Sequence, residues 1–428
     1  MCASRATDDS VARVVIGKRF MQQLDLFDSD QGSEPAIELA ELFEAYFKCR
    51  SNKRNTVNAL AFEVDYEANL LQLHEEINSG SYQPGRSIAF VINKPVKREI
   101  FAADFRDRVV HHLVIHKLNP LFEKLFIHDS YACRKGKGTQ FGIQRVARFI
   151  RQCSLNYTQD CYVLKLDIQG FFMHINKAIL FGELESLICR QYSQSDKPLL
   201  LALCRKIVYY DPTEHCIIKG KRRDWQGLPP DKSLFHSPHN CGLPIGNLSS
   251  QVFANLYMNR FDHFIKHDCG IRYYGRYVDD FIIVHRDQEY LKSLIPRIKA
   301  RLQDNLHLSL HPRKIHLQHY SKGVNFLGVI IKPNRIYIAN RTKGNFYTAI
   351  QKQNTVVTTR KPDKEQQAAF LSSMNSYLGM LKHYRTHKLR KRMLFKHLSA
   401  HWWNHVYLSG GIAMFVLKVK AVKRKTWY

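Results

Sequence analysis

Two adjacent acids, Asp279 and Asp280, offer the clearest chemistry in this sequence. They lie between two runs of β-branched and aromatic residues, 271–274 and 281–284, which predict a tight β-hairpin with the acids at its tip. Neighbouring carboxylates repel each other, so a buried pair stays ionised only when a cation lies between them. Oxygen ligands of this kind suit Mg²⁺, which takes further oxygens from water and from a substrate phosphate. Because an Asp-Asp turn is also a common solvated loop, a metal site requires a further acid.

Asp167 supplies that acid. It ends the short stretch 162–167, whose apolar residues predict a strand. Three carboxylates from two strands can hold the two ions of a phosphoryl-transfer site, one at the attacking hydroxyl and one at the leaving pyrophosphate. The residues therefore predict Asp167, Asp279 and Asp280 as catalytic metal ligands.

The order of three motifs resembles that of reverse transcriptases. The strand with Asp167 comes first, 242–251 follows, and Tyr277-Val278-Asp279-Asp280 comes last, so that the resemblance runs from about Ser87 to Leu327. It implies an α+β right-hand polymerase with an antiparallel palm sheet, fingers and a helical thumb. It also implies two Mg²⁺ ions, or Mn²⁺ in their place, held by the three acids and by the backbone of Ile168.

The resemblance also implies residues that contact the incoming nucleotide. Lys97 and Arg98 match the fingers hairpin that covers the triphosphate, where the planar fork of an Arg can hold two phosphate oxygens; surface ion pairs are the alternative. Phe172 matches the side chain under the sugar, where a large ring would collide with a 2′-hydroxyl and select deoxynucleotides. An ordinary core position is the alternative for Phe172, although Phe171 is available for that role. The predicted nucleotide-binding set is completed by Ile245, Gly246 and Gln251.

Ile245 and Ser250-Gln251 separate this chain from retroviral enzymes, which carry Gln and Ser-Pro at these places. Ile with Ser-Gln resembles the reverse transcriptases of diversity-generating retroelements, which copy a template RNA into cDNA with frequent errors at adenines. The resemblance implies dNTPs, a template RNA, an RNA–cDNA duplex and a small basic accessory protein as substrates and partners.

Several alternatives remain open at this point. Retron, antiviral-defence and group II intron enzymes are other reverse transcriptases with the same motifs. An RNA-templated RNA polymerase is a second alternative, against which Phe172 argues. A non-catalytic RNA-binding protein on a polymerase scaffold is a third, against which the intact set of three acids argues.

Charge favours a nucleic-acid partner. The 428 residues include 65 Lys and Arg against 37 Asp and Glu, a formal net charge of +28. Such an excess binds phosphates and releases their counterions. Solvated surface charge is the alternative for any single residue. The residues predicted to contact nucleic acid are Arg106, Arg134, Lys135, Lys137, Lys314, Arg390, Arg392 and, through close backbone approach in the primer-grip region, Gly328.

Membrane and export signals are not found in the sequence. The longest apolar candidate, from Val406, meets Lys418 too early to span a bilayer. The ten cysteines are scattered singly and predict reduced thiols. Because the first residues lack an apolar signal core, we expect a cytoplasmic protein.

Periodicity predicts the elements that position these residues. Residues 1–34 are polar and predict a loosely held extension. The resemblance implies fingers and palm over 35–335 and a helical basic thumb with a C-terminal tail over 336–428. Prolines in the segment 219–240 predict a surface excursion rather than a domain. Further predicted elements are helices over 39–47, 62–77 and 249–264, a hairpin over 87–100, and strands over 308–315 and 323–329.

Overall fold

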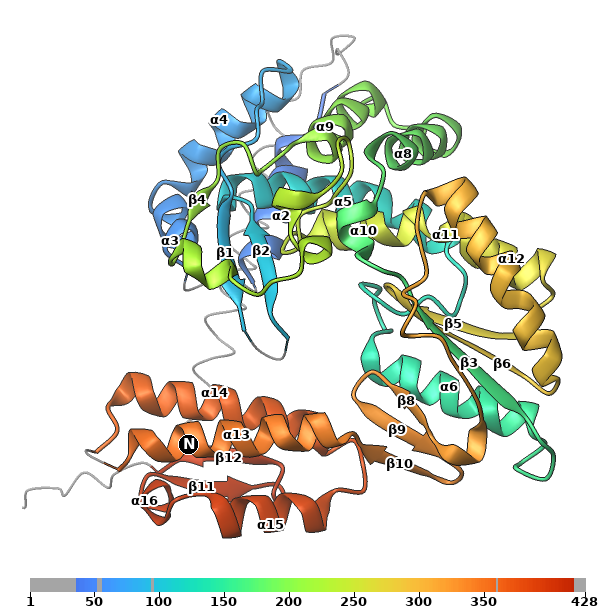
Figure 1. Ribbon diagram of the computed structural model, residues 1–428. Coiled ribbons are helices and arrows are strands. Elements are labelled where there is room, and N and C mark those ends of the chain that lie inside the picture. Colours follow the sequence, from blue (N-terminus) through green and yellow to red (C-terminus); the bar gives the residue numbers. More distant parts are fainter. Residues whose placement is uncertain (1–35, 52–55, 94–95, 359–360, 419–428) are drawn as a thin grey trace, which may run out of the picture. The chain divides into compact units, whose positions relative to one another are not determined.

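A computed structural model describes residues 36–51, 56–93, 96–358 and 361–418 (Figure 1). The predicted extension over 1–34 and the basic tail over 423–428 lie outside these residues. The described chain forms two compact units, each gathered from separated stretches. The first contains the described residues up to Gly138, Leu166–Phe281 and Ser293–Ile315; the second contains Thr139–Lys165, Ile282–Lys292 and the described residues from His316.

Five helices of the first unit pack against one another. They are α2 (Leu39–Arg50), α3 (Val57–Val64), α4 (Tyr66–Asn78), α5 (Phe105–Leu125) and α9 (Lys197–Tyr209). The single helix predicted over 62–77 is wrong, because the chain leaves helical geometry at Asp65, with φ −127° and ψ 49°, and divides it into α3 and α4. Apolar stripes on α2, α4 and α5 are buried, as their helical spacing predicts.

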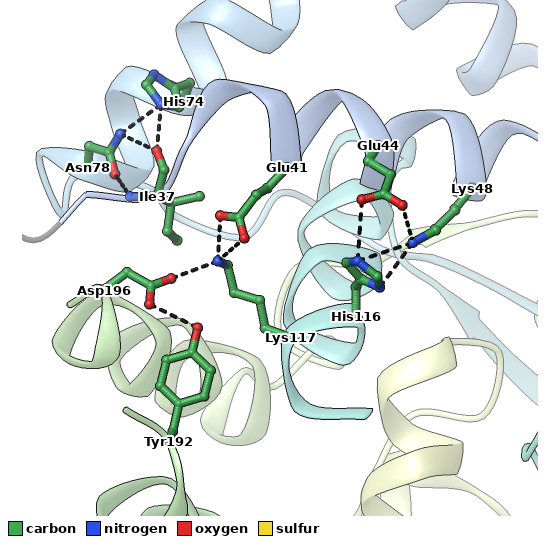
Figure 2. Close-up of polar contacts among 10 residues, drawn as sticks. All are labelled: Ile37, Glu41, Glu44, Lys48, His74, Asn78, His116, Lys117, Tyr192 and Asp196. Atoms are coloured by element: carbon green, nitrogen blue, oxygen red, sulfur yellow. Dashed lines mark hydrogen bonds and ion pairs between the residues drawn. The ribbon is translucent and has the colours of Figure 1, made fainter. Parts of the chain in front are cut away.

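A buried lysine ties α2, α5 and α9 together (Figure 2). The Lys117 side chain on α5 is 7% exposed, and its ammonium forms ion pairs with Glu41 on α2 and, at 2.8 Å, with Asp196 before α9. Tyr192 donates a hydrogen bond of 2.9 Å to the same aspartate. A buried ammonium is stabilised only when carboxylates compensate it, so this cluster fixes the relative position of the three helices.

The fingers hairpin is formed by β1 (Ile88–Ile92) and β2 (Arg98–Ala102), which pair antiparallel. A third strand, β4 (Ile217–Ile218), pairs parallel with β1. It lies directly before the predicted excursion, 219–240, which contains the 3₁₀ turns η2 (Arg222–Trp225), η3 (Pro230–Lys232) and η4 (Leu234–His236). The segment forms no separate domain, as predicted, but Ser233 and Leu234 are buried in it.

A four-stranded sheet carries the three acids. Its order is β5 (Tyr273–Tyr277), β6 (Asp280–His285), β3 (Tyr162–Asp167) and β7 (His316–His319). β3 and β7 pair antiparallel with Tyr162 opposite His319. The strand predicted over 308–315 is wrong, because only Leu310 bridges to Ile168 there and Pro312 has no N–H to donate.

Five further helices lie between the strands of this sheet in the order of the chain. They are α7 (Phe171–His174), α8 (Lys177–Gln191), α10 (Leu248–Tyr257), α11 (Asn259–His263) and α12 (Gln288–Leu306). The helix predicted over 249–264 is divided at Met258, and a π-helical turn, η5 (Phe264–Asp268), follows α11. No helix in the described part of the chain is both long and apolar enough to cross a membrane.

The second unit combines helices with two small antiparallel sheets. One sheet is the meander β8 (Val324–Phe326), β9 (Val329–Lys332) and β10 (Arg335–Ile338), and α6 (Thr139–Cys153) belongs to the same unit. The predicted helical thumb contains α13 (Asn340–Val356), α14 (Lys364–Leu381), α15 (His387–His397) and α16 (Ala400–Trp403). It also contains a hairpin that the sequence analysis did not anticipate, β11 (Val406–Ser409) with β12 (Met414–Leu417), whose Phe415 packs with Trp402 around Phe370.

Candidate active site

Asp279 and Asp280 lie at the turn that joins β5 to β6, as the sequence predicts. Val278 has φ +57°, a left-handed conformation that β-branched residues rarely adopt. The Arg276 guanidinium donates a hydrogen bond of 2.9 Å from Nη1 to the carbonyl oxygen of Val278. A bond from a buried cation to this carbonyl stabilises the strained turn and thereby the position of both acids.

A fully buried ion pair supports the turn from inside the fold. Arg276 and Asp262 are both 0% exposed, and the guanidinium donates from Nε to Oδ1 at 2.7 Å and from Nη2 to Oδ2 at 2.6 Å. Tyr274 donates to the same carboxylate at 2.6 Å, and burial raises its pKa well above the usual range. Buried charges are tolerated when the pairing is bidentate and the remaining hydrogen-bonding groups are satisfied, as they are here.

Asp167 ends β3 beside this turn. The N–H of Ile168 donates to the carbonyl oxygen of Asp279 at 3.3 Å, which brings the two backbone segments together. The N–H of His311 donates to the Asp167 carbonyl at 2.8 Å, and Lys314 Nζ lies 2.8 Å from Asp167 Oδ1. The acids predicted from two distant motifs are therefore neighbours in one site.

The pKa of Asp279 depends on its burial and on the charged side chains around it. Burial, together with the negative charge of Asp167, raises the pKa of Asp279 to about 6. The positive charges of Arg98 and Lys314 act against this rise. Two carboxylates and two cationic side chains therefore influence one another across the site, and the acids retain an uncompensated demand for positive charge.

The donor set fits a divalent cation that takes part of its coordination from a substrate. No three His, Cys, Asp or Glu side chains among the described residues are gathered tightly enough to hold a metal alone. Mg²⁺ can bind through one or two carboxylates together with waters and substrate phosphates. Asp167, Asp279 and Asp280 would hold such an ion, and Ile168, whose side chain is buried and apolar, can contribute only its carbonyl oxygen.

Phe172 and Ile245, predicted to contact the nucleotide, pack against one apolar cluster. The cluster consists of the buried residues Ala89, Phe101, Met173 and Leu234. Phe171 is 3% exposed and takes the core position, whereas Phe172 is half-buried, with its ring centroid 5.4 Å from that of Phe171. The half-buried position leaves part of the Phe172 ring accessible to a ligand.

The other nucleotide-binding predictions fall on the fingers and on the start of α10. Arg98 is exposed at the start of β2, while Lys97 Nζ donates to the carbonyl oxygen of Gln226 at 2.6 Å. Gly246 has φ +136°, and a Cβ there would lie 2.9 Å from the carbonyl oxygen of Phe101, so only glycine fits. Gln251 on α10 accepts a hydrogen bond of 2.7 Å from the Cys133 thiol.

Several basic residues predicted to contact nucleic acid are instead engaged within the first unit. Arg134 has a side chain only 5% exposed and donates to Glu123 and to the carbonyl oxygens of Ile127 and Ser130. Arg106 pairs with Glu76, and Lys137 donates to the carbonyl of His128. These contacts favour structural roles for the three, while Lys135 is exposed.

The second unit holds the three remaining predicted residues. Gly328 forms the turn between β8 and β9 with φ +86°, and its carbonyl oxygen accepts from the Ala339 N–H and the Thr342 hydroxyl. Arg390 is buried and donates to the carbonyl of Ile412, which favours a structural role. Arg392 is exposed on α15.

Sequence reasoning missed two buried charges that hold the site. Arg276 directly precedes the acidic motif in an otherwise apolar strand, and such a position signals a buried partner carboxylate, here Asp262. Glu99 in β2 is 1% exposed and is hydrogen-bonded by the excursion. No local pattern marks Glu99, because its partners lie 126 to 135 positions away in the sequence.

Comparison with solved structures finds telomerases with low sequence identity. A truncated apo telomerase from Candida tropicalis is 14% identical with a TM-score of 0.44, covering 59% of this chain and 55% of that one. Telomerase from Candida albicans, in complex with a fragment of telomeric RNA, is 12% identical with a TM-score of 0.44, covering 79% and 59%. This chain thus spans a little over half the length of those proteins.

Comparison of sequences is more specific. Protein YkfC of Escherichia coli strain K12 is 22% identical over 306 residues, which cover 64% of this chain and 73% of YkfC. The family model described as reverse transcriptase (RNA-dependent DNA polymerase) matches residues 92–331, more than half of the chain. The matched range contains β2 of the fingers hairpin, the three acids, Phe172 and Ile245. The chain therefore belongs to the reverse transcriptase family of RNA-dependent DNA polymerases.

Proposed function

We propose that this protein copies a template RNA into cDNA by two-metal nucleotidyl transfer at Asp167, Asp279 and Asp280. The observation that carries the proposal is the pKa of Asp279, which burial and the Asp167 charge raise to about 6. Two acids held this close by backbone hydrogen bonds require a cation to remain ionised together. Bound Mg²⁺, or Mn²⁺ in its place, would activate a primer 3′-hydroxyl and stabilise the charge that develops on the leaving pyrophosphate.

The protein's own residues supply position and charge for this reaction. Asp279 acts in its ionised form, and the Arg276 contact with Val278 keeps its turn in place. The positive charges of Arg98 and Lys314 act on Asp279. They would also attract the negatively charged triphosphate of a dNTP at this site. Phe172 packs against the apolar cluster with part of its ring accessible, and would exclude a 2′-hydroxyl.

We further propose that synthesis is error-prone at template adenines and serves a diversity-generating retroelement. Ile245 supports this proposal, since its side chain packs against the apolar cluster and its carbonyl oxygen accepts from the Phe101 N–H at 2.9 Å. An aliphatic side chain offers no hydrogen bond with which to discriminate base pairs. A small basic accessory protein would join such a chain through RNA, because two basic proteins repel each other unless a polyanion bridges them.

The direct test is primer extension on a purified RNA template with dNTPs and Mg²⁺, followed by sequencing of the products. The proposal requires cDNA synthesis that Asp279→Asn abolishes while RNA binding persists. It requires in addition more misincorporation opposite template adenine than opposite the other three bases. Uniform errors at all four bases would overturn the retroelement assignment and leave RNA-directed DNA synthesis standing.

A further inference from the structure

We infer that the excursion, extended to residues 217–240 by β4, is a nucleotide-selection element that sets the positions of Phe172, Ile245 and the fingers hairpin. The inference rests on the proposed function, since it presupposes that the site polymerises nucleotides. The excursion first joins the fingers as a strand. The N–H of Ile217 donates to the carbonyl of Ser87 at 2.8 Å, and the N–H of Lys219 donates to that of Ala89 at 2.8 Å. The fingers sheet is therefore completed by the excursion.

Glu99 anchors the excursion to the hairpin. This carboxylate on β2 is 1% exposed and accepts three hydrogen bonds, all from the excursion. Trp225 Nε1 and the Ser233 hydroxyl donate to Oε1 at 2.8 Å each, and the Leu234 N–H donates to Oε2 at 2.6 Å. A buried carboxylate with this many donors is costly to leave unsatisfied, so the hairpin and the excursion hold each other in one arrangement.

The apolar side of the excursion reaches the residues that would select the nucleotide. Leu234 belongs to the same buried cluster as Phe101 of the fingers, and Trp225 packs against it together with Phe172 and Ile245. The two residues that would read the sugar and the base pair therefore share one support. Interiors are close-packed, so a shift of Leu234 is transmitted to both.

Two glycines, one shortly before Phe172 and one shortly before Ile245, show how closely the excursion approaches these segments. Gly170, two positions before Phe172, has φ +54°, and a Cβ there would lie 2.8 Å from the carbonyl oxygen of Asp231. Gly242, three positions before Ile245, has φ +99°, and a Cβ there would lie 2.6 Å from Leu234 Cδ1. Gln169 also donates to the Asp231 carboxylate at 3.3 Å. The excursion thus limits the movement of both segments from the same side.

The geometry assigns Glu99 and Trp225 as positioning residues, because they act on the nucleotide through Leu234 and the cluster. Loosening the anchor lets the Phe172 ring recede and admits a 2′-hydroxyl. The turn that carries Asp279 and Asp280 is supported separately by the Arg276–Asp262 pair. Loosening the excursion should therefore change which nucleotide is accepted more than it changes the rate of the chemical step.

Two variants test this assignment with little change in size. Glu99→Gln replaces one acceptor oxygen with an amide that cannot accept, and Trp225→Phe removes one donor but keeps an aromatic ring. We expect each to lower the ratio of kcat/KM for dNTPs to that for rNTPs by roughly three- to tenfold. The change should come through KM, with kcat for dNTPs and the Mg²⁺ dependence little altered. The matched control is Glu185→Gln, an exposed carboxylate on α8, which should leave the ratio unchanged.

The outcomes separate the inference from the function on which it rests. Wild-type protein that extends no primer with any nucleotide overturns the proposed function. Wild-type protein that extends with dNTPs, while both variants fold and keep the full sugar discrimination, overturns the inference alone. A variant that only lowers kcat and the thermal midpoint, with the ratio intact, assigns the excursion a purely stabilising role and also overturns it. If Glu99→Gln does not fold, the ratio measured for Trp225→Phe decides.

Discussion

The acidic turn at 277–280 and the apolar cluster under Phe172 are each held by a buried charge, but the two charges are satisfied differently. Arg276 under the turn is met by a full opposite charge, Asp262, from a helix 14 positions earlier. Glu99 beside the cluster is hydrogen-bonded by neutral groups of the excursion. Removing one partner of an ion pair leaves a buried charge without compensation. Removing one of three neutral donors leaves the carboxylate with two hydrogen bonds. The comparison indicates that the acidic turn depends on a single charged partner, whereas the apolar cluster depends on several neutral donors.

The largest expected effect concerns the acids themselves. Asp279→Asn removes a charge that the metals require, so primer extension should fall below detection, while RNA binding by filter retention should remain close to wild type. An Asp279→Asn protein that still polymerises would show that the acidic turn takes no part in the chemistry, and the comparison of the turn with the cluster would no longer hold.

The same substitution should stabilise the metal-free protein. The folded state raises the pKa of Asp279 from 3.8 to about 6, so it binds this proton more tightly than the unfolded chain does. Stability contributed by the group is therefore present at low pH and is lost as the pH rises from about 4 to 6. In EDTA at pH 7, Asp279→Asn should raise the free energy of unfolding by roughly 1–3 kcal/mol and remove this pH dependence. Urea unfolding at about pH 4.5 and about pH 7 measures both.

The largest loss of stability should follow from breaking the support of the turn. Arg276→Gln leaves Asp262 buried without its cation, and we expect the free energy of unfolding to fall by about 3–5 kcal/mol. The matched control is Arg260→Gln, because Arg260 is 69% exposed and pairs with Glu183 at 2.7 Å on the surface. That pair should contribute less than about 1 kcal/mol. Equal losses in the two variants would show that the buried pair is no stronger a support than a surface one.

A smaller effect is expected where the sugar is selected. Phe172→Ala opens space beneath the ribose, so the preference for dNTPs over rNTPs should fall by roughly tenfold or more, equivalent to about 1.4 kcal/mol. Extension with dNTPs should fall less. Competition between dCTP and CTP on one template measures the ratio, and an unchanged ratio would return Phe172 to a packing role.

The smallest effect should be in fidelity. Ile245→Gln places a hydrogen-bonding group where the wild type has only packing, and we expect a few-fold fewer errors opposite template adenine. Errors opposite the other bases should change less. Sequencing of cDNA copied from an adenine-rich template measures this. An active variant with an unchanged adenine error rate would place the source of error in the template RNA or an accessory protein.

Local sequence patterns predicted the positions of the acids better than the residues that support them. β3 covers 162–167 as expected, and Asp167 comes to lie beside Asp279, because a strand that ends in an acid and a hairpin with acids at its tip are short-range signals. The buried roles of Arg134 and Arg390 were not predictable, because a count of charges does not show which ones have a carboxylate or carbonyl within reach. Glu99 gives no local signal for the same reason.

The hydrogen-bond donors of Glu99 come late in the chain, so they are synthesised long after the hairpin that they anchor. When β1 and β2 leave the ribosome, the three donors of Glu99 have not yet been synthesised, since the nearest of them follows 126 residues later. By then the strand that ends in Asp167 has already emerged. At a synthesis rate of roughly 5–20 residues per second, this interval lasts on the order of ten seconds. During it the nascent fingers present an unsatisfied acidic hairpin, and a chain truncated before residue 225 would keep that hairpin without its anchor.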